Sequence, residues 1–363
     1  MSQQVFVTGM LRSGTTLVQT LLTNHPRAFV AYQPFHQLHV DVKEVFLSSR
    51  GIKRNLPLGD GMDESPVEAS QFRDWLMTHR FSDAEAQSLA DHATVAKGGG
   101  GSEFAGRLSA RAGTFFQIRE NLLGQVAEYF GQAQTPVVGA KEVLCEEYVA
   151  AMCDADVKCV IVLRDPRAVI ASANQGSYRE SVGDRYPLLM LVRLWRKSVA
   201  HCLALQRVPG VSVVRYEDLV ANPFDELRKL TTWLEIEEFP AGVVSGPLTD
   251  HAGEPWRGNS SFGTKAGVDD TSSTAWRQRL AVGESQFIEA CTVAELRSFG
   301  FEATLGEDEA RNAIENFRED ESQVRPAYLR TYALTGASRE REVERIRYWH
   351  ALPGRYCRER TDY

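Results

Sequence analysis

Residues 9–17, with the sequence GMLRSGTTL, constrain the fold of this chain more than any other segment. They follow the short apolar run 5–7 and lead into apolar residues at helical spacing, at 17, 18, 21 and 22. An anion can bind at a turn that contains glycine and lies between a strand and the start of a helix. Unpaired N–H groups and the positive end of the helix dipole face such a turn. The segment therefore predicts an α/β unit that binds an anionic group.

The spacing of Gly9 and Gly14 matches the phosphate-binding loop G-x-x-x-x-G-K-[ST], but Thr15 stands where that loop has its lysine. In nucleoside triphosphatases this lysine contacts the β- and γ-phosphates, and the hydroxyl after it binds Mg²⁺. A loop that lacks the lysine and carries Arg12 suits an anion that arrives without a metal ion.

Short apolar runs alternate with helical patterns along the chain. The predicted buried strands lie at residues 5–7, 29–31, 137–138 (leading to Lys141), 157–163 and 211–214. The helical patterns lie at residues 13–23, 146–153, 166–173, 188–205 and 223–234. Such alternation predicts an α/β fold, a parallel β-sheet flanked by helices on both faces. Ligands bind these sheets beyond the carboxyl ends of the strands, where the 9–17 loop lies.

Residues 40–133 interrupt this alternation with polar sequence, for which we expect a mostly helical insertion. Apolar residues between 115 and 126 predict a long core-facing helix within it, and the glycine-rich run 97–102 predicts a connecting loop or a lid. After residue 305 the chain is rich in charge, with a solvent-exposed helix expected at 339–347. The expected organisation is one domain at 1–305 and a charged helical extension at 306–363.

Composition limits the classes of partner and compartment. A chain of 363 residues that is 43% apolar can bury a full core. Its net charge of −7 argues against nucleic acid as a partner. The six cysteines have no metal-binding spacing, and no apolar stretch reaches the length of a membrane span. We therefore expect a cytoplasmic protein with reduced thiols, no metal site and no targeting segment.

A second candidate anion site follows the most apolar of the predicted strands. Arg164 stands at the carboxyl end of that strand, Pro166 suits the first turn of the next helix, and Ser172 lies almost two turns along it. A guanidinium and a hydroxyl in these positions can hold one tetrahedral anion. The alternative is a structural turn made by Arg164 and Asp165, but a second anion site at the same sheet edge as the 9–17 loop favours a functional role.

With these two sites the chain resembles the PAPS-dependent sulfotransferases, especially bacterial and carbohydrate-type members, whose fold is related to that of P-loop NTPases. Their donor, 3′-phosphoadenosine 5′-phosphosulfate (PAPS), carries two separate anionic groups. Segments similar to the family occur in family order at 24–26 (NHP), 31–36 (AYQPFH), 215–219 (RYEDL), 222–223 (NP), 259–262 (NSSF), 276–277 (WR) and Leu280. The resemblance covers most of residues 3–302 and leaves the insertion and the extension uncovered.

The resemblance implies roles for individual residues at the donor site. The implied contacts of the 5′-phosphosulfate are Arg12, Ser13, Gly14, Thr15, Thr16 and Leu17. Those of the 3′-phosphate are Arg164 and Ser172, and those of the adenine end are Tyr216, Ser260, Ser261 and Lys265. Lys141 is implied at the transferring sulfonate or the bridging oxygen, and the alternative for it is a surface lysine paired with Glu142.

The implied reaction is in-line, metal-free transfer of a sulfuryl group from PAPS to a hydroxyl of a small molecule, sugar, lipid, phenol or natural product, with adenosine 3′,5′-bisphosphate as the second product. We expect the insertion at 40–133 to determine acceptor specificity. The sequence names neither the acceptor nor the oligomeric state. Two other hypotheses stay open: a P-loop kinase of a small metabolite, and a catalytically silent nucleotide-binding protein.

The general base is the point at which this chain departs from the family pattern. Related sequences have a glutamate at the position of Gln33, and an amide does not accept a proton usefully. His36 is the first substitute as base, followed by His39 and then Asp41. Alternatively, the acceptor is acidic enough to need little help, or Gln33 replaces a native glutamate.

Overall fold

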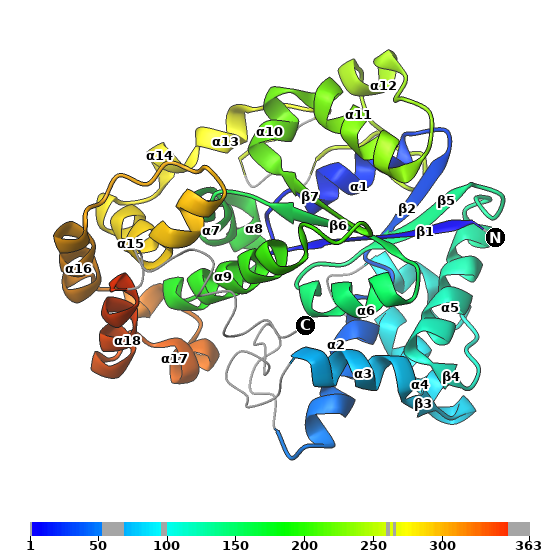
Figure 1. Ribbon diagram of the computed structural model, residues 1–363, viewed down its shortest axis with the longest axis horizontal. Coiled ribbons are helices and arrows are strands. Elements are labelled where there is room, and N and C mark those ends of the chain that lie inside the picture. Colours follow the sequence, from blue (N-terminus) through cyan, green and yellow to red (C-terminus); the bar gives the residue numbers. More distant parts are fainter. Residues whose placement is uncertain (1, 53–68, 96–99, 259–261, 264–265, 348–363) are drawn as a thin grey trace.

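The protein is built around a five-stranded parallel sheet in the order β2-β5-β1-β6-β7 (Figure 1). The computed structural model describes residues 2–52, 69–95, 100–258, 262–263 and 266–347. The strands are β1 (Gln3–Gly9), β2 (Ala28–Tyr32), β5 (Val137–Lys141), β6 (Lys158–Leu163) and β7 (Val211–Arg215). All five strands predicted from apolar runs are confirmed, and β1 lies at the centre of the sheet.

Helices cover both faces of the sheet, as the alternating pattern predicts. Along β1, Val5 and Val7 face one core, whereas Phe6 faces the other, because successive side chains of a strand point to opposite faces. The first core is covered by α1 (Thr15–Thr23), α10 (Tyr216–Ala221), α11 (Pro223–Leu234) and α12 (Ala241–Ser245). The second is covered by α5 (Phe115–Tyr129), α6 (Val149–Asp154), α7 (Pro166–Asn174) and α9 (Leu188–Leu205).

Two predicted helix starts differ from the structure. The helix predicted at 13–23 begins at Thr15, since Ser13 and Gly14 still belong to the loop after β1. The segment predicted as a helix at 146–153 opens with a 3₁₀ turn, η2 (Glu146–Tyr148), before α6 begins. The helices α9 and α11 have the predicted bounds, because their apolar residues keep helical spacing up to both ends.

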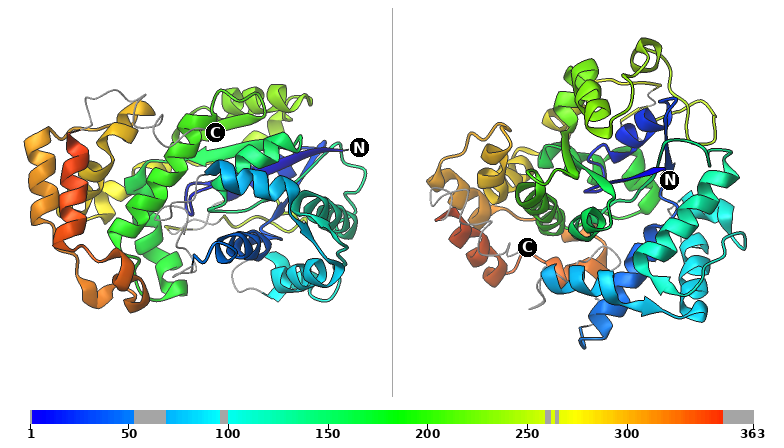
Figure 2. Two further views of the ribbon diagram at one scale, coloured as in Figure 1. Left: turned by 60° about the horizontal axis from the view of Figure 1, so that its bottom comes forward. Right: turned by 45° about the vertical axis from the view of Figure 1, so that its right-hand side comes forward.

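The segment between β2 and β5 is mostly helical and shares the core of the sheet domain. Its elements are α2 (His36–Ser48), α3 (Ala69–Thr78), α4 (Asp83–Val95), the 3₁₀ turn η1 (Gly100–Phe104) and α5, with an unpredicted antiparallel pair, β3 (Arg80–Phe81) and β4 (Gly113–Thr114). Phe46, Phe72 and Phe115 belong to the same core cluster as Phe6 of β1. These elements lie beside the sheet edge formed by β2 and β5 (Figure 2).

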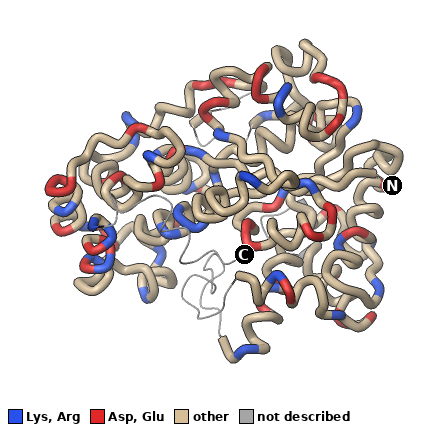
Figure 3. Tube along the Cα trace, viewed as in Figure 1, with Lys and Arg blue, Asp and Glu red and all other residues tan. Residues whose placement is uncertain are grey.

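The C-terminal part packs at the other end of the molecule. It contains α13 (Thr271–Thr274), α14 (Trp276–Arg279), α15 (Val282–Ser298), α16 (Glu307–Asn316), the 3₁₀ turn η3 (Glu321–Gln323), α17 (Pro326–Tyr332) and α18 (Gly336–Ile346). Charged residues of both signs lie along α16 and α18 (Figure 3). The helix predicted at 339–347 is thus present, but it is not simply solvent-exposed: Ile346 is buried, and Glu342 pairs with Arg196 of α9.

No helix among the described residues is long and apolar enough to cross a membrane.

Candidate active site

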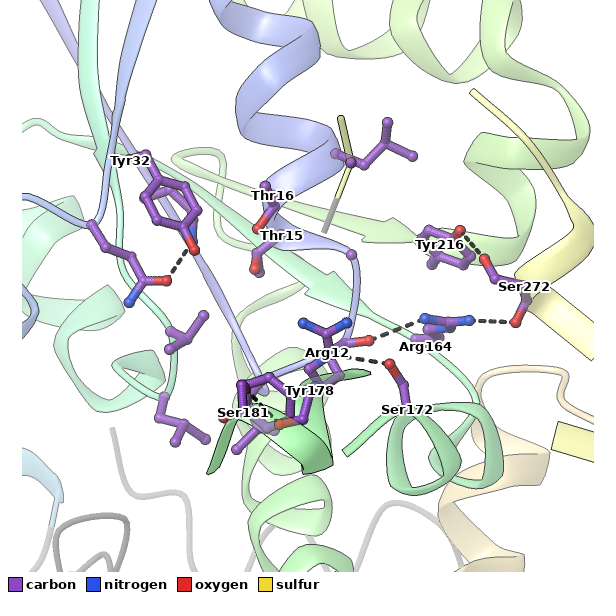
Figure 4. A pocket seen from close by; sticks show the side chains of 18 of the residues that line it. Arg12, Thr15, Thr16, Tyr32, Arg164, Ser172, Tyr178, Ser181, Tyr216 and Ser272 are labelled. Carbon is purple, nitrogen blue, oxygen red and sulfur yellow. Dashed lines mark hydrogen bonds between the residues drawn. The ribbon is translucent and has the colours of Figure 1, made fainter. Parts of the chain in front are cut away.

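A cavity of about 630 Å³ opens at the carboxyl ends of the parallel strands (Figure 4). Each of the five strands leads into at least one lining residue: Arg12 after β1, Tyr32 at the end of β2, Lys141 at the end of β5, Arg164 after β6 and Tyr216 after β7. The cavity therefore lies where parallel α/β sheets bind their ligands.

The loop between β1 and α1 depends on its two glycines. Gly9 has a φ of 146°, and a Cβ there would lie 2.4 Å from the carbonyl oxygen of Val162. Gly14 has a φ of 100°, and a Cβ there would lie 2.3 Å from Cδ2 of Tyr216. The loop passes so close to β6 and to the ring of Tyr216 that neither position can carry a side chain. The start of α1 then lines the cavity with Thr15, Thr16 and Leu17. Its positive dipole end suits an anion.

Arg12 is held on two sides at the edge of the cavity. Its Nε donates to Oγ of Ser172 at 3.0 Å, and its guanidinium lies over the Tyr178 ring at 4.8 Å from the centroid. Its backbone has a φ of 65°, which is unusual for a residue other than glycine. Burial lowers the pKa of Arg12 to about 10, so the guanidinium stays charged at neutral pH.

Arg164 and Ser172 line the same cavity, and each has its own hydrogen-bond partners there. Ser172 accepts from Arg12, whereas the Arg164 guanidinium donates to the carbonyl oxygens of Arg12, at 3.1 Å, and Ser272, at 2.5 Å. It also lies over the Tyr216 ring at 4.2 Å. Nε of Arg164 is buried without a hydrogen-bond partner among the described residues. Arg164 therefore supports the Arg12 loop, and one of its N–H donors is unused among these residues.

Lys141 is a buried lysine at the end of β5, and not a surface lysine paired with Glu142. Its Nζ donates to Oε1 of Gln33 at 2.6 Å and lies over the Tyr32 ring at 3.8 Å. Burial lowers the pKa of Lys141 to about 7, an effect that Glu142 opposes and Arg12 reinforces. Glu142 instead accepts from the backbone N–H of Phe35 at 2.7 Å, and burial raises its pKa to about 8.

Gln33 occupies a strained turn beside Lys141. Its φ of 42° is in the left-handed region, which is costly for a residue other than glycine and common at functional sites. The turn directs the amide oxygen of Gln33 toward Lys141 rather than away from the cavity. A glutamate at position 33 would therefore form an ion pair with Lys141, whereas the amide leaves the lysine charge uncompensated at this contact.

Of the three side chains considered as substitute bases, the cavity contains only His36 among its described lining residues. His39 is buried in an aromatic cluster with Phe6, Phe115 and Tyr148, and burial lowers its pKa to about 3. Asp41 accepts hydrogen bonds from Gln37 at 2.5 Å and from His92 of α4 at 2.7 Å, and it does not line the cavity. The structure therefore gives no geometric support to His39 or Asp41 as the base.

The structure describes only Tyr216 of the residues expected at the adenine end. Tyr216 lines the cavity between Gly14 and Arg164, and its hydroxyl lies 2.7 Å from Oγ of Ser272. Ser260, Ser261 and Lys265 lie outside the described residues. Ser13 is buried, but it is absent from the cavity lining, and its Oγ has no partner among the described residues.

Sequence reasoning missed a second group of lining residues. Tyr178, Ser181, Val182 and Tyr186 come from α8 (Gly176–Val182) and the loop after it, and Arg325 and Tyr328 come from the C-terminal extension. No motif marks either segment, because only the tertiary fold brings them together. No described residue of 40–133 lines the cavity.

Comparison with known families decides the assignment. A family model described as "Sulfotransferase family" matches residues 4–241. The chain belongs to the sulfotransferase family. The chain thus shares the sulfuryl-transfer chemistry of this family in general terms, and its parallel sheet with flanking helices is the expected sulfotransferase-like fold.

Similar solved structures include the "Sulfotransferase Domain from the Curacin Biosynthetic Pathway", with 17% identity, a TM-score of 0.47, and coverage of 84% of this chain and 99% of that one. The "Sulfotransferase Domain from the Synechococcus PCC 7002 Olefin Synthase" has 18% identity, a TM-score of 0.45, and coverage of 84% and 96%. Sulfotransferase STF1 from Mycobacterium tuberculosis H37Rv has 15% identity, a TM-score of 0.32, and coverage of 65% and 68%. Comparison with curated protein sequences gives no significant match. The family assignment rests on the family model.

Proposed function

We propose that this sulfotransferase transfers the sulfuryl group of PAPS to a hydroxyl of a small-molecule acceptor. The observation that carries the proposal is the joint lining of one cavity by the 9–17 loop and by Arg164. Two separate cationic groups, Arg12 and Arg164, suit a donor with two separate anionic groups. The free thiols of the described cysteines fit a reducing cytoplasm, which we propose as its location.

Arg12 and the start of α1 are proposed to stabilise the leaving group. As the acceptor oxygen forms a bond to sulfur, the bond between sulfur and the bridging oxygen breaks, and negative charge grows on the 5′-phosphate. A charged guanidinium and helix N–H groups lower the energy of this transition state more than that of the ground state. The products are a sulfate ester and adenosine 3′,5′-bisphosphate.

Lys141 is proposed to contact the transferring sulfonate or the bridging oxygen. It is buried at the cavity wall, and its side-chain acceptor among the described residues is the neutral amide of Gln33. An incoming sulfonate would therefore supply the negative charge that Gln33 does not. Tyr216 and the lining residues Gly14 to Leu17 are proposed to complete the donor site, with Ser172 acting through its bond to Arg12.

His36 is proposed as the base that accepts the proton of the acceptor hydroxyl. It lines the cavity three residues beyond Gln33, which holds the family's base position but is bonded to Lys141 as an amide. A neutral imidazole near pH 7 has a suitable pKa for this step.

A catalytically silent nucleotide-binding protein is the second candidate, and the amide at position 33 is the observation that favours it. A kinase is disfavoured because Thr15 replaces the loop lysine, and because Asp269 is the single carboxylate among the described lining residues.

The test is turnover of PAPS in the presence of a metal chelator, measured as adenosine 3′,5′-bisphosphate formed with a panel of alcohols and phenols. We expect turnover with PAPS and none with ATP and Mg²⁺. Turnover with ATP would establish the kinase instead. Tight binding of PAPS without turnover, also in the Gln33→Glu variant, would establish the silent protein.

A further inference from the structure

Beyond Arg12 the cavity continues into a part with a different chemical character. We call this part the tyrosine subsite, which consists of Tyr178, Ser181, Val182, Tyr186, Arg325 and Tyr328. The first four residues follow α7 in the chain, whereas the last two belong to the C-terminal extension. Figure 4 shows Tyr178 and Ser181 on the side of Arg12 away from Tyr216.

The C-terminal extension is fastened to this wall by backbone contacts. Arg185 and Val324 form a parallel bridge, in which the Arg185 N–H donates to the carbonyl of Gln323 at 2.8 Å and the Arg325 N–H donates to the carbonyl of Arg185 at 3.0 Å. The Leu188 N–H also donates to a carboxylate oxygen of Glu319 at 2.8 Å. The extension is therefore part of the cavity wall, and the expected boundary at residue 305 does not separate it from the site.

Arg325 is a positive charge without a compensating carboxylate. Its guanidinium donates to the carbonyl oxygen of Val182 and stacks at 5.8 Å from the Tyr186 ring and 5.5 Å from the Tyr328 ring. No carboxylate among the described residues pairs with it, and the rings of Tyr186 and Tyr328 lie 5.6 Å apart. The two tyrosines thus hold the guanidinium in place at the cavity wall while leaving its charge unpaired.

The charges of the whole cavity point the same way. Its described lining has four basic side chains, Arg12, Lys141, Arg164 and Arg325, against the single carboxylate of Asp269. The proposed donor accounts for the first three through its phosphosulfate and its 3′-phosphate. The donor offers no anionic group for Arg325, so an anion that pairs with Arg325 would have to belong to the acceptor.

Tyr178 connects this subsite to the reacting centre. Its ring lies against the Arg12 guanidinium, which is proposed to face the phosphosulfate, and it also contributes to the tyrosine subsite. An acceptor bound along the tyrosines would therefore have one end near the sulfonate and the other near Arg325.

We propose that the tyrosine subsite binds the acceptor, and that this acceptor is a hydroxyl compound with an aromatic or similarly flat body and a carboxylate that pairs with Arg325. This inference rests on the proposed function and adds the acceptor class to it. The tyrosine rings offer flat apolar contacts, and a charge-assisted guanidinium–carboxylate pair gives the selectivity. Acceptor choice is then set by α8 and α17 rather than by the insertion at 40–133.

The experiment compares two phenols that differ only in charge, 3-(4-hydroxyphenyl)propionate and its primary amide. Their affinities are measured by calorimetry on the full chain saturated with adenosine 3′,5′-bisphosphate, so that no turnover is needed. One charge-assisted contact corresponds to roughly 10–100-fold in affinity. We expect the wild-type protein to prefer the acid by about this factor, and the Arg325→Gln variant to bind both phenols equally.

Arg330→Gln is the matched control, because Arg330 is an exposed arginine of α17, the helix that Arg325 precedes, and it does not line the cavity. It should keep the preference for the acid. Equal wild-type affinities for acid and amide would overturn the proposal, whether or not the Arg325→Gln variant folds. Weaker binding of adenosine 3′,5′-bisphosphate by Arg325→Gln would also overturn it, since Arg325 would then hold the donor. A preference for the acid without any turnover of PAPS would uphold the subsite and refute the proposed reaction.

Discussion

Donor binding should draw a proton from solvent onto Lys141. The lysine is buried beside the amide of Gln33, and burial lowers its pKa from the ordinary 10.5 to about 7. In the free protein at pH 8 the uncharged amine therefore predominates. The sulfonate and phosphate of PAPS favour the charged form, so binding raises the pKa of Lys141.

The size of the effect follows from the two pKa values. With a pKa of about 7, Lys141 is protonated in roughly one-tenth of the free molecules at pH 8. Once the donor raises the pKa of Lys141 well above 8, almost all bound molecules carry the proton, so binding takes up most of one proton. Because the bound form holds more protons, the donor affinity falls as pH rises above 8, by up to about tenfold per pH unit.

Isothermal titration calorimetry with PAPS, without an acceptor, in buffers of different ionisation enthalpy measures this proton uptake directly. Lys141→Met is the control variant, since methionine fills similar space without a titratable group. We expect uptake near one proton for the wild-type protein and close to none for the variant. No uptake by the wild-type protein, or equal uptake by both, would refute the assignment of Lys141 to the sulfonate.

Three further outcomes are expected. Gly14→Ala should lose donor binding, measured by calorimetry, and about 1–3 kcal/mol of stability, measured by thermal melting, because its Cβ would clash with Tyr216 at a φ of 100°. Gly242→Ala is the control and should change little in either measurement, because a Cβ there meets open space. Arg164→Ala should weaken binding of adenosine 3′,5′-bisphosphate roughly 10–100-fold more than binding of adenosine 5′-phosphosulfate, and equal losses would show that the 3′-phosphate is held elsewhere. His36→Ala should lower turnover by roughly 10²–10⁴-fold and remove the fall in rate at acidic pH, while Gln33→Glu should change the pH–rate profile less. Unchanged turnover and an unchanged pH–rate profile in His36→Ala would exclude His36 as the base.

The sheet could be predicted because its strands are short apolar runs buried on both faces. The runs Val5–Val7 and Val160–Val162 are recognisable as buried strands from the sequence alone. The alternation of strands and helices then predicts that the loops at the carboxyl ends of the strands form the site. The pair β3 and β4 was not predictable, since two-residue strands such as Arg80–Phe81 leave no periodicity in a sequence.

Site residues could be predicted where they stand at strand ends, as Arg12, Lys141 and Arg164 do. Their partners could not, because these come from distant parts of the chain. The carbonyl of Ser272 holds Arg164 across 108 residues, and nothing in the sequence around Ser272 indicates that contact. Likewise, Arg325 reaches the cavity through a backbone bridge to residue 185, which leaves no side-chain pattern.

The central claim is that Arg12 stabilises the charge that develops on the leaving phosphate. The most direct measurement is the rate of sulfate ester formation from PAPS by the wild-type protein and by the Arg12→Ala variant. The control is Arg228→Ala, which changes an exposed arginine of α11. We expect Arg12→Ala to abolish transfer and weaken donor binding, and Arg228→Ala to leave both unchanged. Unchanged kinetics in Arg12→Ala would contradict it.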